Sequence, residues 1–103
     1  MSNESGKMLI SICRGYIKLG VSGQRMLGVL MESGGRFEGG YTKLGKLIGE
    51  EPTNVRKTVL RIIKYGIVRV EFAKSKKSSP MVAMELADDW VLVLENLGKD
   101  NQL

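Results

Sequence analysis

The most constraining feature of this sequence is a pair of helix-forming segments, separated by only a few residues, within residues 42–66. Thr42 is placed to cap the first segment, and Gly49 ends it. Pro52 favours the first turn of the second segment, which Gly66 closes. Apolar side chains at helical spacing lie on one face of each: Leu44, Leu47 and Ile48 in the first, and Val55, Val59, Leu60, Ile62 and Ile63 in the second. We therefore expect two helices that pack against each other through these faces.

The apolar pattern changes from helical to alternating spacing directly after Gly66. Residues 67–72, and a second segment that ends at residue 86, alternate in polarity, which predicts two half-buried strands. The side chains expected to face inward are Val68, Val70 and Phe72, then Val82, Met84 and Leu86. The polar residues 74–80 connect the strands as a loop. Because a lone hairpin is marginally stable, we expect it to pack against the helix that ends at Gly66.

Helical spacing also predicts two helices before this region. Residues 5–19 form an amphipathic helix, although Gly15 inside it costs about 1 kcal/mol relative to alanine. Ser22 is placed to cap the second helix, and the glycine pair 34–35 ends it. The expected apolar stripes are Met8, Leu9, Ile12, Cys13, Tyr16 and Ile17, then Met26, Leu27, Leu30 and Met31. Of the six methionines, we interpret Met8, Met26, Met31 and Met84 as core residues.

The remaining segments complete one domain. Residues 36–40 predict a loop or a very short strand. A C-terminal helix is expected from Ala87, capped by Asp88 or Asp89 and anchored by Trp90, Leu94 and Leu97. A length of 103 residues supports one hydrophobic core. We expect a single α+β domain over residues 1–103, mainly α with a β-hairpin: N-terminal helices in 5–35, the helix pair in 42–66, the hairpin in 67–86 and the last helix in 87–98.

Composition argues against catalysis and membrane insertion. The chain has no histidine and one cysteine, which excludes imidazole-based catalysis and a His/Cys metal site within one chain. We therefore expect no enzyme activity, no cofactor and no metal. The apolar runs, such as residues 90–94, are too short to cross a bilayer, and the N-terminus lacks a signal-peptide pattern. A single cysteine fits a reducing cytoplasm, where we expect the protein.

The net charge of +5 is unevenly distributed. Residues 36–77 contain eleven Lys or Arg and four Asp or Glu, a net +7, whereas the rest of the chain carries −2. A basic segment with mildly acidic flanks is typical of a unit that binds a polyanion. It is equally typical of a solvated basic surface.

The helix pair matches the helix-turn-helix motif, two helices joined by a short turn entered through a glycine. The first turn of its second helix is polar, and in this motif that end enters the major groove of DNA. Asn54 and Arg56 are candidates for reading bases, because asparagine pairs with adenine and arginine with guanine. Thr53 is a candidate contact to phosphate or a thymine methyl group. The full set of candidate DNA-contacting residues is Pro52, Thr53, Asn54, Arg56, Lys57 and Arg61 in the second helix, with Lys43, Lys46, Lys74, Lys76, Lys77 and Ser78 as contacts to the DNA backbone.

Residues 42–86 resemble the bacterial winged-helix families of the ArsR and MarR kind. The short helix, the glycine, the second helix and the closing Gly66-Ile67-Val68 match those families in register. The resemblance implies a winged helix-turn-helix fold in which residues 74–80 form the wing. An ArsR-type metal sensor would need Cys or His ligands that this chain lacks, and MarR-type regulators are usually longer.

In its size, its layout and its lack of sensor residues, this chain is similar to TubR-type plasmid partition proteins, which bind centromeres. That resemblance implies a homodimer that binds repeated sites on double-stranded DNA and can repress its own operon. It also implies that the dimer links this DNA to a tubulin-like GTPase filament, and the acidic C-terminal region is a candidate contact to the filament. We expect a sequence-specific, homodimeric DNA-binding protein. The alternatives are a winged-helix transcriptional repressor with no partition role and a winged-helix protein-interaction module.

Three other features of the sequence are the apolar faces of two helices, the single cysteine and a pair of acidic residues. The first helix and the helix over residues 90–97 have apolar faces larger than a small core needs, so we expect both in a symmetric dimer interface. Cys13 lies on the first of these faces and is expected in the core or the interface. Glu50 and Glu51 repel phosphate, so they either favour the start of the second helix through its dipole or select cytosine; the first role is the simpler.

Overall fold

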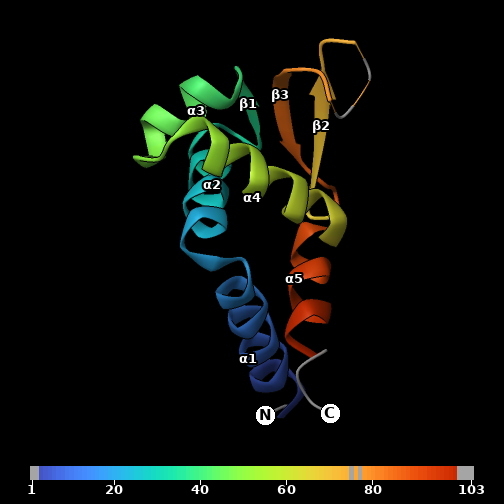
Figure 1. Ribbon diagram of the computed structural model, residues 1–103. Coiled ribbons are helices and arrows are strands. Elements are labelled where there is room, and N and C mark those ends of the chain that lie inside the picture. The colour runs from blue at the N-terminus through green and yellow to red at the C-terminus, as the bar shows by residue number, and fades with distance from the viewer. Residues whose placement is uncertain (1–2, 75, 77, 100–103) are drawn as a thin grey trace.

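The computed structural model describes residues 3–99 apart from residues 75 and 77. These residues form a mainly helical chain with one small antiparallel sheet (Figure 1), as the α+β prediction required. The elements in chain order are α1 (Asn3–Lys18), α2 (Gly20–Glu32), β1 (Arg36–Glu38), α3 (Tyr41–Ile48), α4 (Pro52–Tyr65), β2 (Val68–Phe72), β3 (Met81–Leu86) and α5 (Trp90–Lys99). No helix among the described residues is both long and apolar enough to cross a membrane.

The sheet has the strand order β1-β3-β2, so β1 adds a third strand to the expected hairpin. A bulge lies at Val82 of β3: Glu71 pairs with Ala83, whereas the next residue, Phe72, pairs with Met81. The bulge shifts the alternation of β3 by one residue, so Met81 and Ala83 face the core while Val82 is 44% exposed. The prediction that Val82 faces inward was therefore wrong, whereas Met84 is buried as expected.

The core lies between α2, α3, α4 and the sheet. Met26 and Leu30 of α2 are completely buried at its centre. The buried apolar cluster is Leu19, Met26, Leu27, Leu30, Phe37, Leu44, Ile48, Val55, Val59, Ile62, Ile67, Val68, Met81, Met84 and Leu94. Every element except α1 therefore contributes at least one residue to a single packed centre.

The turn between α3 and α4 depends on Gly45 and Gly49. Gly49 adopts a left-handed backbone (φ 75°), which ends α3 and redirects the chain. A Cβ atom on Gly45 would lie 2.5 Å from the carbonyl oxygen of Glu50, so only glycine allows the turn to close against α3. Leu44 and Val55 are both buried at this junction, which confirms the predicted packing of the two helices.

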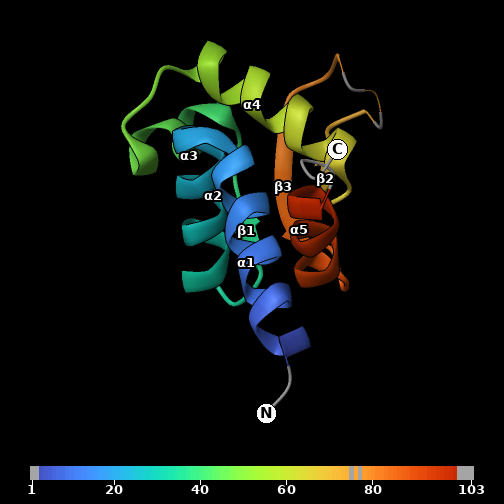
Figure 2. The ribbon, with the colours of Figure 1, turned by 90° about the horizontal axis from the view of Figure 1, so that it is seen from below.

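Helices α1 and α5 lie side by side at one end of an elongated molecule of 47 × 27 × 26 Å (Figures 1 and 2). We call this pair the arm. Its contact is unusually close: a Cβ atom on Gly15 would lie 1.9 Å from the Leu94 carbonyl oxygen, and one on Gly98 would lie 1.8 Å from the Ser11 carbonyl oxygen. Two glycines, one on each helix, therefore let the two backbones touch.

Several predicted caps and core positions were wrong. Helix α2 begins at Gly20 rather than after Ser22, and the N-cap of α3 is Gly40 rather than Thr42. Seven residues of the expected apolar stripes are exposed: Met8 (46%), Leu9 (63%), Cys13, Tyr16 (39%), Ile17 (67%), Met31 (57%) and Leu47 (59%). Because α1 packs mainly on α5 alone, its stripe has no partner on the opposite side within the chain.

Candidate nucleic-acid interface

The first two turns of α4 present a polar, exposed surface. Val55 and Val59 anchor the buried side of the helix, while Thr53, Asn54 and Arg56 are exposed, as are Pro52 and Lys57. Proline occupies the first helical position, and the N-cap residue makes no side-chain hydrogen bond to the helix. The amides of the first turn have no partner within the helix, and the helix dipole is positive here. This end of α4 therefore favours an anion.

An open hollow of about 540 Å³ brings α3, α4 and the end of the hairpin loop together. Its lining includes Lys43 and Lys46 from α3, Pro52 from α4 and Pro80 from the hairpin loop. These residues are far apart in sequence, and their common location fits a shared binding surface. A second hollow of the same size adjoins it and includes Lys46, Pro52 and Asn54.

Tyr41 is a residue of this surface that the sequence analysis did not single out. Its ring lines the first hollow, and within the described residues its buried hydroxyl has no hydrogen-bond partner. Burial raises the pKa of the Tyr41 hydroxyl, and the nearby Arg56 guanidinium lowers it in part. The hydroxyl is therefore a neutral donor at neutral pH. No sequence signal marked it, because the helix was expected to begin only at Thr42.

The cations of the basic segment divide into two groups. Within the described residues, ion pairs use Arg36 (with Glu38 and Glu71) and Arg69 (with Glu85 and Asp88), on the sheet. The hydrogen bonds that Arg36 donates to the Glu71 and Glu38 carboxylates raise the pKa of its guanidinium group. The cations of the second group form no ion pair with any other described residue: Lys43, Lys46, Arg56, Lys57, Arg61, Lys64, Lys74 and Lys76. Lys64, exposed near the end of α4, is a cation that the candidate set had left out.

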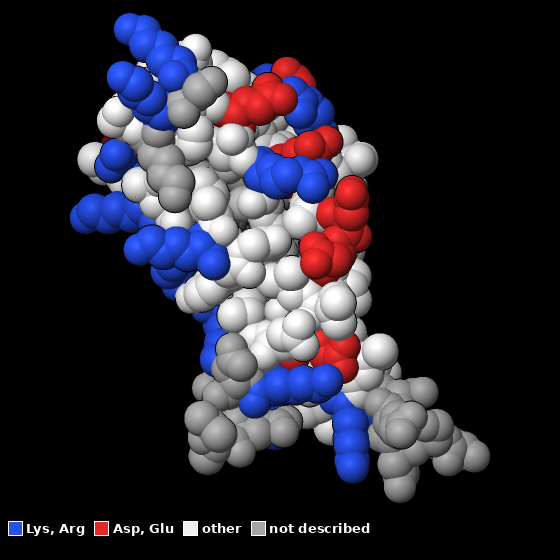
Figure 3. All heavy atoms as spheres, turned by 90° about the vertical axis from the view of Figure 1, so that its right-hand side faces the viewer, with Lys and Arg blue, Asp and Glu red and all other residues white. Residues whose placement is uncertain are grey.

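The surface view shows that charges of opposite sign gather on different sides of the molecule (Figure 3). Lys and Arg side chains run along one edge of the molecule, whereas Asp and Glu gather toward the opposite side with a few cations among them. An asymmetric distribution of this kind gives one side of the molecule a positive potential.

Two candidate residues have partners inside the protein. Lys43 Nζ donates a hydrogen bond to the Glu38 carbonyl oxygen (2.9 Å) and lies 5.5 Å from the centre of the Phe37 ring. An ammonium group has three donors, so Lys43 keeps two for a ligand. Arg61 Nη2 donates to the Leu19 carbonyl oxygen (2.7 Å). In the hairpin loop, Lys74, Lys76 and Ser78 are exposed, and Lys77 lies outside the described residues.

The two acidic residues of the turn have different positions. The Glu50 carboxylate accepts a hydrogen bond from Ser22 and is therefore directed toward α2. Glu51 is the exposed N-cap residue of α4, so its influence on the helix is through charge rather than a hydrogen bond.

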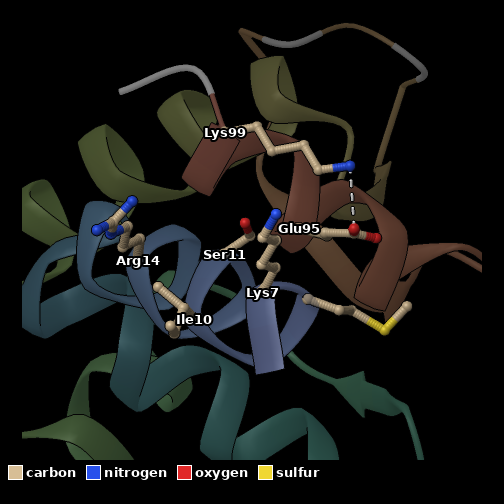
Figure 4. A pocket seen from close by; sticks show the side chains of 7 residues that line it. Lys7, Ile10, Ser11, Arg14, Glu95 and Lys99 are labelled. Carbon is tan, nitrogen blue, oxygen red and sulfur yellow. Dashed lines mark ion pairs between the residues drawn. The ribbon is translucent and has the colours of Figure 1, made fainter. Parts of the chain in front are cut away.

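A separate hollow of about 620 Å³ lies on the arm (Figure 4). Lys7, Ser11 and Arg14 of α1 line it together with Glu95 and Lys99 of α5, and Lys99 Nζ lies 3.0 Å from Glu95 Oε2. Among the described residues, no three His, Cys, Asp or Glu side chains gather as metal ligands, here or elsewhere. The hollow is formed by the arm alone and takes no residue from α3, α4 or the hairpin loop.

No protein-family model, no curated protein and no solved structure matches this chain.

Proposed function

We propose that this protein binds double-stranded DNA in a sequence-specific manner, as a homodimer with a winged helix-turn-helix fold. The observation that carries the proposal is the group of exposed cations on α3, α4 and the hairpin loop around the polar N-terminus of α4, which form no ion pair within the described residues. In this proposal α4 enters the major groove, and the hairpin loop reaches the adjacent DNA backbone.

The chemistry of the exposed side chains suggests a division of labour. Asn54 and Arg56 read base edges, as their bidentate hydrogen-bonding geometry allows. Lys43, Lys46 and Lys57 contact phosphates, with the lysines of the hairpin loop. Phosphate contacts fix the register of the protein on DNA and supply most of the salt-dependent affinity.

We expect the protein to bind a labelled random-sequence duplex at low salt, with affinity that falls steeply as salt rises. Six phosphate contacts per protomer, twelve in the dimer, would give a slope of about −11 in a plot of log K against log salt concentration, since each contributes about −0.9. Fluorescence anisotropy over a salt series measures this slope. Absence of binding at about 50 mM salt, where nonspecific binding is strong, would refute the proposal.

The outer face of α1 supports the homodimer. Leu9 (63% exposed), Ile17 (67%) and Val21 (63%), the last at the start of α2, form an apolar surface together with exposed Cys13. A group of exposed apolar side chains on one surface is typical of an interaction site, which a second copy of the chain would cover.

We expect the substitution Ile17→Glu to convert the dimer to a monomer, because it places a charge within this apolar face. Sedimentation equilibrium at tens of micromolar protein measures the mass. Val82→Glu is the matched control, since Val82 is an exposed apolar residue of the sheet, and that variant should remain dimeric. A wild-type protein that is monomeric at this concentration would contradict the prediction.

The biological role that we propose is plasmid or phage partition, with repression of the protein's own operon as a second effect of the same binding. This part rests on the resemblance in size and layout to TubR-type proteins, and its partner would be a tubulin-like GTPase filament. Footprinting on the DNA around the coding sequence tests it. A short array of direct repeats supports partition, and a single palindrome supports a transcriptional repressor instead.

A further inference from the structure

The junction between α1 and α2, residues 18–20, forms a sharp elbow. Helix α1 ends at Lys18 and α2 begins at Gly20, whose left-handed backbone (φ 74°) breaks the helical path. Leu19 between them is only 1% exposed. The elbow is therefore one of the two attachments of the arm to the rest of the molecule; the other is α5, whose Leu94 is buried in the core.

Arg61 of α4 holds the elbow directly. Its Nη2 atom donates a hydrogen bond to the Leu19 carbonyl oxygen, 2.7 Å away. A Cβ atom on Gly20 would lie 3.3 Å from the same nitrogen, so the guanidinium group packs against the elbow backbone. The Leu19 carbonyl directly follows the last residue of α1, and a charged donor makes a stronger hydrogen bond to a carbonyl than a neutral one does.

Two further polar contacts bind the start of α2 to the turn between α3 and α4. Ser22 donates to the Glu50 carboxylate, and Arg25 Nη1 donates to the Ile48 carbonyl oxygen at 3.1 Å. Neither contact reaches α4. Of these three polar contacts, only that of Arg61 joins the elbow to the helix that is proposed to enter DNA.

We infer that Arg61 is a positioning residue that sets the angle between the arm and α4, rather than a ligand of DNA phosphate. The contact itself does not depend on DNA. Its consequence rests on the proposed function: in a dimer formed through α1, the angle of the arm determines how far apart the two α4 helices lie. That distance must match the spacing of successive major grooves, about 34 Å.

The test measures the distance between the arm and α4 within one chain. Nitroxide labels on Cys13 and on Lys57→Cys report this distance by pulsed electron spin resonance, with unlabelled protein in excess to remove distances between protomers. Arg61→Gln should broaden and shift the distance distribution. Lys64→Gln, which removes an equal charge from the same helix, should leave it unchanged, and Arg61→Lys should restore it in part because lysine retains a donor.

A purely stabilising role would not change this distribution, because it would lower the folded fraction without altering the geometry of folded molecules. An unchanged distribution in Arg61→Gln overturns the inference. Binding to random-sequence duplex supplies the second readout. If Arg61 were a phosphate ligand, Arg61→Gln would reduce the salt slope by about 1 per protomer; as a positioning residue it leaves the slope unaltered. Failure of the wild-type protein to bind duplex would refute the proposed function while leaving the distance measurement decisive for Arg61.

Discussion

Replacing Gly98 with alanine is expected to destabilise the protein by about 3 kcal/mol, the upper end of the usual cost of overpacking. The new Cβ would lie 1.8 Å from the Ser11 carbonyl oxygen and 2.6 Å from its carbon, and both are backbone atoms that no rotamer change can move. Helices α1 and α5 would have to separate along their length. The direction of the change in stability is informative, because replacing a glycine inside a helix with alanine otherwise stabilises the helix by about 1 kcal/mol. Urea denaturation followed by circular dichroism measures the loss.

Gly28→Ala is the matched control for this prediction. Gly28 also lies inside a helix, but a Cβ atom there meets nothing within 4 Å. We expect this variant to be more stable than the wild type by about 0.5–1 kcal/mol, the ordinary gain in helix propensity. If Gly98→Ala and Gly28→Ala change stability in the same direction, α1 and α5 do not approach each other as closely as described.

The two glycines of the arm also show what sequence patterns could and could not reveal. From the sequence, Gly15 could be interpreted only as a residue that weakens a helix, because helix propensity contains no information about Leu94, its contact on α5. The helix pair was predicted accurately, because Gly49, Pro52 and Gly66 are local signals that act within a few residues. The bulge at Val82 was missed because it arises from pairing between strands.

The candidate interface divides in the same way. The exposure of Asn54, Arg56 and Lys57 followed from helical periodicity, since the opposite side of α4 is apolar. Periodicity could not predict the contact of Arg61 with Leu19, which joins residues 42 positions apart. Nor could the net charge of the basic segment reveal that Arg36 and Arg69 are paired with carboxylates on the sheet.

The double variant Arg56→Gln/Lys57→Gln is expected to lower the affinity for the specific DNA site at least about 100-fold at physiological salt. Loss of a bidentate contact to guanine costs about 1–3 kcal/mol, and each factor of ten in affinity corresponds to about 1.4 kcal/mol, so the losses in two protomers reach this value. The specific site is first obtained by selection from a random duplex pool, and anisotropy titrations then give the two dissociation constants.

The single variants separate the two roles, because a base contact and a phosphate contact differ in their dependence on sequence. Arg56→Gln should weaken binding to the selected site more than to random duplex, whereas Lys57→Gln should weaken both about equally and reduce the salt slope by about 1 per protomer. The matched control is Arg36→Gln/Arg69→Gln, which removes the same charge from the same basic segment but from residues that are paired with carboxylates. That control should retain nearly full affinity. An equal loss in both double variants would mean that affinity follows net charge alone, and it would remove the case for α4 as the helix that reads DNA.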